Sequence, residues 1–578
     1  MKYIGMPIIF FAALVFLFFR FLLEEKNRKA AFEKKLSELW GKVPFGYQAG
    51  KGDAGKRTGR YLKIFDGRFR IDEITWEELD MAEVFSRMDY TMSQMGAEYL
   101  YETLHCPAEN KKEAEKWEET VSYFSTDVKA RIKVQMLLAA IGKNTGKSNG
   151  KSTGERNGER TSFHSPVKEY LADLLYLAAV VMAMYDTGAG LCALALLIVY
   201  QILSYFRERA KILPFLKDIA RALRLMTCLE KLERELQPEI CSMVENALSV
   251  NLHDCIKKLE ILKRHSFWVL QCGRENNSPL SMVGDYIRML FHADIIQFLR
   301  LTKKMQEMEG EIQNGAVFAG FLDSSISIAL YRASLENYCL PELLEETLEE
   351  TSEVSGIAEF LMTDGYHPLL EKPVSNSIVV YDKGVLLTGS NASGKSTFLK
   401  TVAVNLLLAQ TIHTTLASRF RAPISRIYTS MGARDDILKG ESSYMAEILS
   451  LKRILDAGEK EGKVPIFCFV DEILRGTNTV ERIAASAQIL KYFSKTGTGC
   501  FAATHDSELI TLLKEEYEHY YFTEEIKNGD ICFPYRLLSG SGDTGNAIRL
   551  LAATGYHREI TEGAERMAAD FRKERVWK

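Results

Sequence analysis

The sequence has no C-x-x-C pair and no excess of charge of either sign. Its ten cysteines are scattered along 578 residues, so a zinc ribbon or a dithiol redox centre is not expected, and they indicate free thiols of a reducing compartment such as the cytoplasm. The 73 Lys and Arg nearly balance 77 Asp and Glu, which excludes a basic, histone-like coat on nucleic acid. With only 39 Gly and 13 Pro, collagen-like and wholly disordered classes are excluded as well.

Two long apolar runs stand out. The first, residues 3–23, is interrupted only by Arg20 and has the length of a membrane-spanning helix. A cleaved signal peptide is the alternative, but EEKN follows the run and no small-residue cleavage site is present. We therefore expect a transmembrane anchor over 1–23, followed by a juxtamembrane region and the start of a helical core over 24–141.

The second apolar block, residues 170–206, is divided by a turn at 186–190 and predicts a transmembrane hairpin. A buried hairpin of a soluble core is the alternative. Lys and Arg flank both apolar runs and are absent from the hairpin turn, which favours the membrane. The expected protein is a multi-pass protein of the cell membrane with three spans, its N-terminus outside and residues 24–169 and 207–578 in the cytoplasm.

The remaining segments differ in composition. Residues 142–165 are rich in Gly, Ser, Asn and Lys and predict a flexible cationic linker, either merely solvated or in contact with nucleic acid. Residues 207–355 carry apolar residues at helical spacing and predict a helical core or lever domain. From residue 375, short β-rich runs alternate with helices, which is typical of a parallel α/β sheet, and we assign 356–578 to that domain.

A phosphate-binding loop lies at 384–400, GVLLTGSNASGKSTFLK. An apolar strand, the pattern G-x-x-x-x-G-K-[ST] and a helix follow one another, which is the setting of a Walker A loop. Its backbone N–H groups would surround phosphates, with Lys395 reaching the β- and γ-phosphates and Ser396 offering its hydroxyl to Mg²⁺. ATP and Mg²⁺ are the expected cofactors. The candidate nucleotide-binding residues of the loop are Gly389, Ser390, Asn391, Ala392, Ser393, Gly394, Lys395, Ser396 and Thr397.

Two further strands end in ionisable residues. IFCFVDEI at 466–473 predicts a buried strand that ends in Asp471, the second expected Mg²⁺ ligand beside Ser396, and Glu472, which would orient or deprotonate the attacking water. GCFAAT is followed by His505, either a structural histidine or a sensor of the γ-phosphate; the sensor is favoured because histidines at this edge of a sheet face the ligand crevice. The predicted catalytic residues are Glu472, His505 and Lys395.

The order of the motifs resembles that of a known family. After the Walker A loop come GESSYMAEI (440–448), DEILRGTNT (471–479) and ATH (503–505), with YHPLL (366–370) before it and GNAIRLLAATGYHREITEGA (545–564) at the end. Together they resemble the ATPase domain of the MutS DNA mismatch-repair family, an ABC-type ATPase. A weaker similarity at 88–107 resembles the opening of the family's helical core.

The resemblance implies a homodimer with composite nucleotide sites. Ser442, or Ser443 in its place, would reach the γ-phosphate held by the other subunit. Asn391 matches the asparagine of the family's phosphate loop, and Asn478 with Thr479 matches its interface loop. Tyr366 or His367 would lie near the adenine.

The expected fold is multi-domain. It has an N-terminal transmembrane helix, an all-α core or lever domain with an inserted transmembrane hairpin, and a C-terminal α/β P-loop ATPase domain of the ABC type. A mismatch-reading domain is not expected, because residues 24–80 carry no G-x-F-Y-E-like motif.

The expected function is that of a dimeric MutS-like ATPase acting on duplex or branched DNA at the lipid bilayer, in a process like mismatch repair. One alternative is a nucleotide-switched membrane scaffold that does not bind DNA. The other is an ABC-type transport ATPase. The transport ATPase is disfavoured because LSGSG at 538–542 follows the Walker B strand, whereas the transporter signature precedes it.

Overall fold

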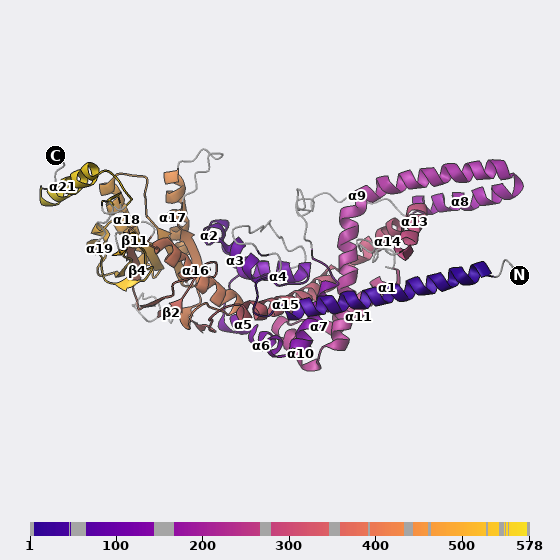
Figure 1. The fold of residues 1–578 in the computed structure, drawn as a ribbon, viewed down its shortest axis with the longest axis horizontal. Helices are drawn as coiled ribbons and strands as arrows, with labels where there is room; N and C mark the ends of the chain where they lie inside the picture. The colour runs from indigo at the N-terminus through magenta and orange to yellow at the C-terminus, as the bar shows by residue number, and fades with distance from the viewer. Residues whose placement is uncertain are drawn as a thin grey trace.

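The molecule is elongated, with the α/β part and the C-terminus at one end and the N-terminus with a long helical hairpin at the other (Figure 1). In this computed structural model the described residues are 5–44, 47, 65–143, 167–265, 279–345, 359–390, 393–432, 443–460, 464–527, 530–542, 548, 551–552 and 554–574. Most of the predicted linker, from residue 144 onward, lies outside them.

The part of the chain before the sheets is helical, as predicted. Its elements are α1 (Gly5–Ser37), α2 (Glu73–Glu78), α3 (Met81–Met88), α4 (Gln94–His105), α5 (Lys111–Glu115), α6 (Glu118–Thr126), α7 (Val128–Ala139), α8 (Val167–Tyr185), α9 (Thr187–Glu235), α10 (Pro238–Leu248), α11 (Leu252–Leu259), η3 (Glu260–His265), α13 (Pro279–Phe291), α14 (Ala293–Glu307) and α15 (Glu309–Ala333).

Helix α15 runs through the middle of the helical core and packs on α4 and α6. Nearly all of its side chains from Gly315 to Arg332 are buried. The close approach to α4 is possible because Gly320 and Gly96 lack side chains; a Cβ on Gly96 would lie 2.2 Å from Asp323 Oδ2. Asp323 in turn accepts hydrogen bonds from the backbone N–H groups of Met92 and Ser93 at the start of α4. A buried carboxylate on one helix therefore supports the N-terminus of another.

The C-terminal part contains the predicted parallel sheet. In the described residues, six strands are ordered β12-β9-β4-β8-β7-β6, and all neighbours are parallel except β12 and β9. The strands are β4 (Gly384–Thr388), β6 (Arg426–Ser430), β7 (Ile466–Asp471), β8 (Gly499–Ala503), β9 (Tyr517–Tyr521) and β12 (Leu538–Ser539). The side chains of β4 and β8 are buried throughout, as expected for strands covered on both faces.

Helices cover both faces of this sheet. Helix α16 (Lys395–Ile412) covers one face and packs with the alternate residues Leu387, Phe469 and Phe501. Helices α17 (Ser443–Lys460) and α18 (Thr479–Lys495) cover the other face, where Leu386, Cys468 and Ala502 point. The remaining helices are α19 (Glu508–Leu512) and α21 (Arg558–Glu574).

Two smaller strand groups accompany the main sheet. Strands β1 (Glu342–Leu344), β5 (Arg419–Pro423), β2 (Phe360–Gly365) and β3 (Asn376–Val380) form a second sheet in that order, and β10 (Glu525–Lys527) pairs with β11 (Asp530–Cys532). Strand β1 lies before residue 356, where the sequence placed the start of the α/β domain. A three-residue strand is too short to show the period-two pattern that predicts strands.

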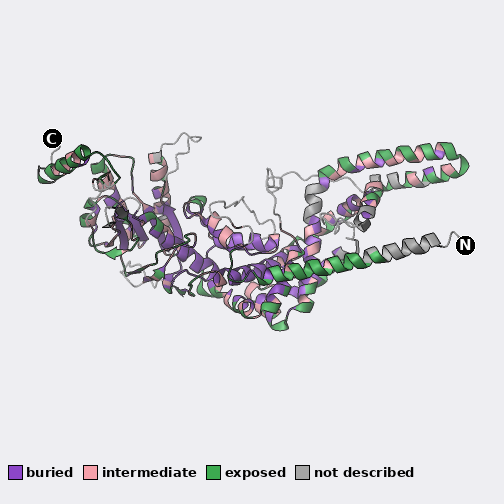
Figure 2. Cartoon of the chain, in the orientation of Figure 1, coloured by how far each residue is buried: buried purple, intermediate pink, exposed green. Residues whose placement is uncertain are grey.

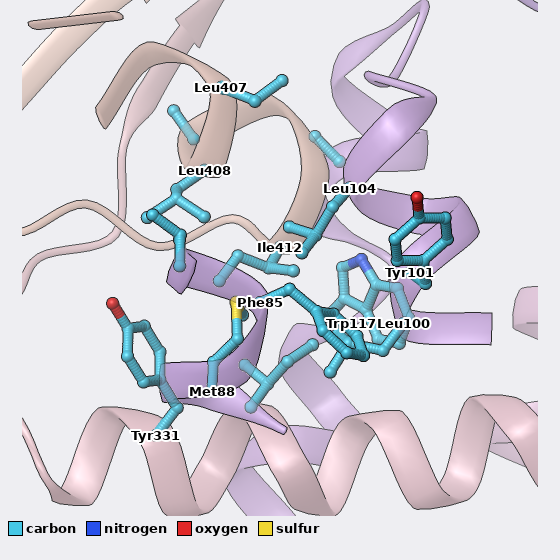
Figure 3. Close-up of a cluster of buried hydrophobic side chains, with 14 of the residues drawn as sticks. Phe85, Met88, Leu100, Tyr101, Leu104, Trp117, Tyr331, Leu407, Leu408 and Ile412 are labelled. Carbon is cyan, nitrogen blue, oxygen red and sulfur yellow. The ribbon is translucent and has the colours of Figure 1, made fainter. Parts of the chain in front are cut away.

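The helical core and the α/β part share one hydrophobic cluster. Figure 3 shows Leu407, Leu408 and Ile412 at the end of α16 against Leu104 and Phe85 of the helical core. Polar bonds reinforce this junction: Trp117 Nε1 donates to Thr411 O over 2.9 Å, and Glu118 binds both Arg332 of α15 and His413 at the end of α16. The helix that begins at the phosphate loop thus ends inside the helical core.

The hairpin of α8 and α9 projects from the core, and Figure 2 colours many of its residues as exposed. Met184 and Tyr185 at its tip are 83% and 91% exposed. Helix α9 continues from the hairpin into the core without a break at 206–207, where the sequence placed a boundary. Figure 1 shows α9 bending between these two segments. Pro214, which cannot donate a helical hydrogen bond, is one of the residues of α9.

The prediction of three membrane spans is not supported. In the described residues, one helical stretch, Thr187–Ile212, is long and apolar enough to cross a membrane by length and composition, and the apolar stretch of α8, Leu174–Tyr185, is too short. The apolar stretch of α8 is thus shorter than that of α9. The first residues of α8 include Lys168, Glu169 and Asp173, which are not apolar. Membrane localisation itself stays a prediction.

Candidate active site

The predicted site residues meet at the C-terminal edge of the main sheet. Strand β8 lies between β4 and β7, with Leu387 opposite Ala503 on one side and Asp471 opposite Ala503 on the other. The phosphate loop follows β4, the Asp471–Glu472 pair ends β7, and His505 follows β8. Parallel strands bring these three chain ends to a single edge, which is why motifs far apart in the sequence form one site.

The glycines of the loop are required by its shape. Gly389 has φ of 146°, and a Cβ at this position would lie 2.6 Å from the carbonyl oxygen of Phe522. Gly394 has φ of 109° and is the N-cap residue of α16. Since it has no side chain to bond to the first turn of α16, the N–H groups of that turn are left for a ligand.

Lys395 lies over the loop. Its Nζ donates to Gly389 O at 2.9 Å and to Ser390 O at 2.8 Å, and it lies 3.3 Å from His505 Nε2. Burial lowers the pKa of the Lys395 ammonium, while the charges of Asp471 and Glu472 raise it. A helix N-terminus is a common binding site for phosphate. The Lys395 ammonium lies at that position, so it can exchange the carbonyl oxygens for phosphate oxygens.

Ser396 and Asp471 form the oxygen pair predicted for Mg²⁺. The Ser396 hydroxyl donates to Asp471 Oδ2. Asp471 Oδ1 is buried and has no hydrogen-bond partner in the part of the chain that the structure describes. Burial raises the pKa of the Asp471 carboxyl. A hydroxyl and a carboxylate with one oxygen left over fit a hard divalent cation, which prefers oxygen ligands.

Glu472 and His505 form a contact beside this pair. His505 Nε2 lies 3.1 Å from Glu472 Oε1, and this hydrogen bond lowers the pKa of Glu472. The same Nε2 also lies within reach of Lys395 Nζ. The nitrogen can donate to Glu472 or accept from Lys395, but not both at once, so the proton on the ring decides between the two bonds.

The other predicted residues are placed as follows. Ser393 donates to Ser390 O at 2.8 Å within the loop, and Thr397 is exposed in the first turn of α16. Asn478 caps α18 by accepting from Val480 N–H at 2.9 Å. Asn391, Ala392 and Ser442 lie outside the described residues.

His367 lies in the turn after β2, near Lys400 of α16. It is 6% exposed, and its Nε2 has no hydrogen-bond partner among the described residues. Burial, helped by the nearby charge of Lys400, lowers the pKa of His367 to about 4, so the ring is neutral at physiological pH. Its predicted role near adenine stays a prediction.

Sequence reasoning did not single out three residues that contact this site. Glu524 accepts from Ser390 Oγ at 2.8 Å, and Arg475 pairs with Glu472 over 2.6 Å. Glu447 of α17 accepts hydrogen bonds from backbone N–H groups just after Glu472. Glu447 and Arg475 lie inside motifs already noted, but Glu524 follows β9 in a stretch with no motif.

Comparison with known proteins finds similarity over the same part of the chain. Residues 385–572 match the family model "MutS domain V". Three similar proteins are each named DNA mismatch repair protein MutS. That of Methanococcoides burtonii is 25% identical over 48% of this chain and 31% of its own length, and that of Rickettsia akari is 29% identical over 45% and 30%. That of Fusobacterium nucleatum is 33% identical over 34% and 23%.

These matches cover less than a third of the length of each of the three relatives. The family model begins at residue 385, after α15, the last helix of the helical part. The C-terminal α/β part of the chain, residues 385–572, is therefore similar to domain V of the MutS proteins.

Proposed function

We propose that the chain is an ATPase that binds and hydrolyses ATP at the edge of its main sheet and works as a homodimer. The observation that carries the proposal is the meeting of Lys395, Ser396, Asp471, Glu472 and His505 at one edge. The match of residues 385–572 to MutS domain V supports it.

In this proposal, different residues of the site bind the phosphates, hold Mg²⁺ and activate the attacking water. The loop N–H groups and Lys395 hold the phosphates, Lys395 by exchanging the carbonyls of Gly389 and Ser390 for phosphate oxygens. Ser396 and Asp471 would hold Mg²⁺, which when bound neutralises charge on the phosphate oxygens. Glu472 orients the attacking water and takes its proton, and the depressed pKa of Glu472 keeps the carboxylate ionised for this role.

Composite sites complete the proposal. Ser442, or Ser443 at the start of α17, would donate to the γ-phosphate bound by the other subunit, and Asn478 would lie at the same interface. A hydroxyl at the start of a helix is a suitable donor to an anionic oxygen.

DNA is the proposed macromolecular substrate, because the similar proteins carry the name DNA mismatch repair protein. The bilayer is the proposed location. The exposed apolar side chains of the α8–α9 hairpin support membrane insertion, and both the hairpin and the N-terminal end of α1 extend toward the end of the molecule opposite the ATPase part (Figures 1 and 2). A scaffold that switches with nucleotide but ignores DNA is the alternative.

The test is the rate of phosphate release from ATP by the detergent-solubilised protein, with and without duplex, branched and mismatched DNA at two salt concentrations. Lys395→Ala is the control that should abolish nucleotide binding. Stimulation that weakens as salt rises would support DNA contact through phosphates. A basal rate that no DNA changes would favour the scaffold, and an absence of ATP turnover in the wild type would contradict the proposal.

A further inference from the structure

The turn after Asp471 has an unusual backbone. Glu472 and Leu474 have φ of 54° and 57°, in the left-handed region that residues with side chains rarely adopt. Such conformations cost free energy and persist only where the surroundings hold them. Because Glu472 is one of the two residues, the orientation of its side chain depends on whatever holds this turn.

A carboxylate from another helix holds it. Glu447, in the second turn of α17, accepts a hydrogen bond from Leu474 N–H through Oε1 and one from Arg475 N–H through Oε2, the latter 3.2 Å long. Burial raises the pKa of the Glu447 carboxyl, and these two hydrogen bonds lower it. One side chain therefore binds two consecutive N–H groups of the turn.

A second contact joins the same helix to the same turn. Tyr444 lies against the backbone of Gly476, where an added Cβ would lie 3.1 Å from the Tyr444 Cβ. Ile448 packs with the cluster that contains Ile473 and Leu474. Helix α17 is thus joined to residues 473–476 by both polar and apolar contacts.

We propose that Glu447 is a positioning residue, which sets the orientation of Glu472 by fixing the turn that carries it. This inference rests on the proposed ATPase function. It also has a consequence for the dimer, because α17 begins at Ser443, next to the serine expected to reach the nucleotide of the other subunit. A displacement of α17 by the partner's nucleotide would act on the Glu472 turn of its own subunit.

A carboxylate is the side chain that the turn requires. Both oxygens of Glu447 accept, which matches two N–H donors. Glutamine has nearly the same shape but offers one acceptor oxygen and an NH₂ group, so one N–H of the turn would face a donor instead. Glu447→Gln therefore perturbs the turn with little change in packing.

The experiment compares Glu447→Gln with Asp456→Asn, the same chemical change farther along α17. Steady-state ATP hydrolysis and hydrogen exchange of the segment 472–478 are measured for both variants and for the wild type. We expect Glu447→Gln to lower kcat by about 10- to 100-fold with KM changed less than about 2-fold, and to speed exchange at Leu474 and Arg475. Asp456→Asn should behave as the wild type in both measurements.

Other results would overturn the inference. A Glu447→Gln protein with wild-type kcat would show that Glu472 does not depend on this support, and unchanged exchange would show that the bonds do not hold the turn. If Glu447→Gln fails to fold, Gly476→Ala, which crowds Tyr444 at the second contact, should lower kcat in the same way; a Gly476→Ala protein with wild-type kcat would overturn the inference. A wild type without ATP turnover would refute the proposed function, whereas the exchange measurement would still test the Glu447 bonds.

Discussion

Replacing Glu118 by glutamine tests the junction through which the Walker A helix enters the helical core. Glu118 accepts from Arg332 Nη2 at 2.7 Å and Nη1 at 3.0 Å, and it lies 2.9 Å from His413 Nδ1 at the end of α16. The Arg332 and His413 side chains are each 6% exposed. Glu118→Gln therefore leaves the buried guanidinium of Arg332 without its carboxylate partner.

The expected loss of unfolding free energy depends on the hydrogen bonds that Arg332 keeps in the variant. Removing one partner of a buried ion pair costs about 3–5 kcal/mol, because a charge is left buried without its counter-ion. Arg332 still donates to Thr414 Oγ1 at 2.8 Å and to His413 O at 2.9 Å. We therefore expect the lower end of the range, about 3 kcal/mol of unfolding free energy, for Glu118→Gln.

The assay is urea unfolding followed by tryptophan fluorescence. Trp117 reports on this junction directly, since its ring stacks on Phe321 with centroids 4.6 Å apart and its Nε1 donates to Thr411 O. Glu119→Gln is the matched control, because Glu119 is the exposed neighbour and should cost less than about 0.5 kcal/mol. If the two variants unfold at the same urea concentration, the junction is not held by this ion pair and the reasoning is wrong.

The pH dependence of the same junction has a definite sign. Burial raises the pKa of Glu118, but the hydrogen bonds from His413 and Arg332 outweigh it and leave the pKa below its usual value. A carboxyl with a depressed pKa stabilises the fold above its unfolded pKa of about 4.3, and this contribution is lost as the pH falls through the folded value. The stability difference between the wild type and Glu118→Gln should therefore shrink in acid.

Two further predictions concern the core and the dimer. Burial raises the pKa of Asp323 from 3.8 to about 6, so its ionisation should lower the free energy of unfolding by about 3 kcal/mol as the pH rises from about 4 to above 6. Asp323→Asn should remove this fall from the plot of unfolding free energy against pH. If the plot is the same for the variant and the wild type, Asp323 is not the group that titrates. In a mixture of Ser442→Ala and Lys395→Ala subunits, each mixed dimer should retain at most one competent site, and full activity of the isolated mixed dimer would contradict shared sites.

That the candidate site residues lie at one edge of the sheet could be predicted from the sequence for a physical reason. Loop, strand and helix lie within one short segment at 384–400, and parallel strand order brings Asp471 and His505 to the same edge. The supports of that edge could not be predicted in this way. Glu447 accepts a hydrogen bond from Leu474 N–H, 27 residues away in the sequence. Glu118 pairs with Arg332, which is 214 residues away. Contacts at such separations leave no periodic or local pattern.

The apolar segment at 170–206 shows what composition alone does not predict. Apolar composition predicted a hairpin at 170–206, and the structure has a hairpin of α8 and α9 there. Composition did not show that α9 continues as one helix to Glu235, because the pattern changes from apolar on all faces to amphipathic while the backbone stays helical.

The most direct measurement of the central claim compares ATP binding and hydrolysis by the wild type with Glu472→Gln. Glutamine keeps the shape of Glu472 but cannot take a proton from water, so we expect ATP to bind as in the wild type while turnover falls by at least about 100-fold. Lys395→Ala should lose binding as well. Wild-type turnover by Glu472→Gln would contradict the account of the site.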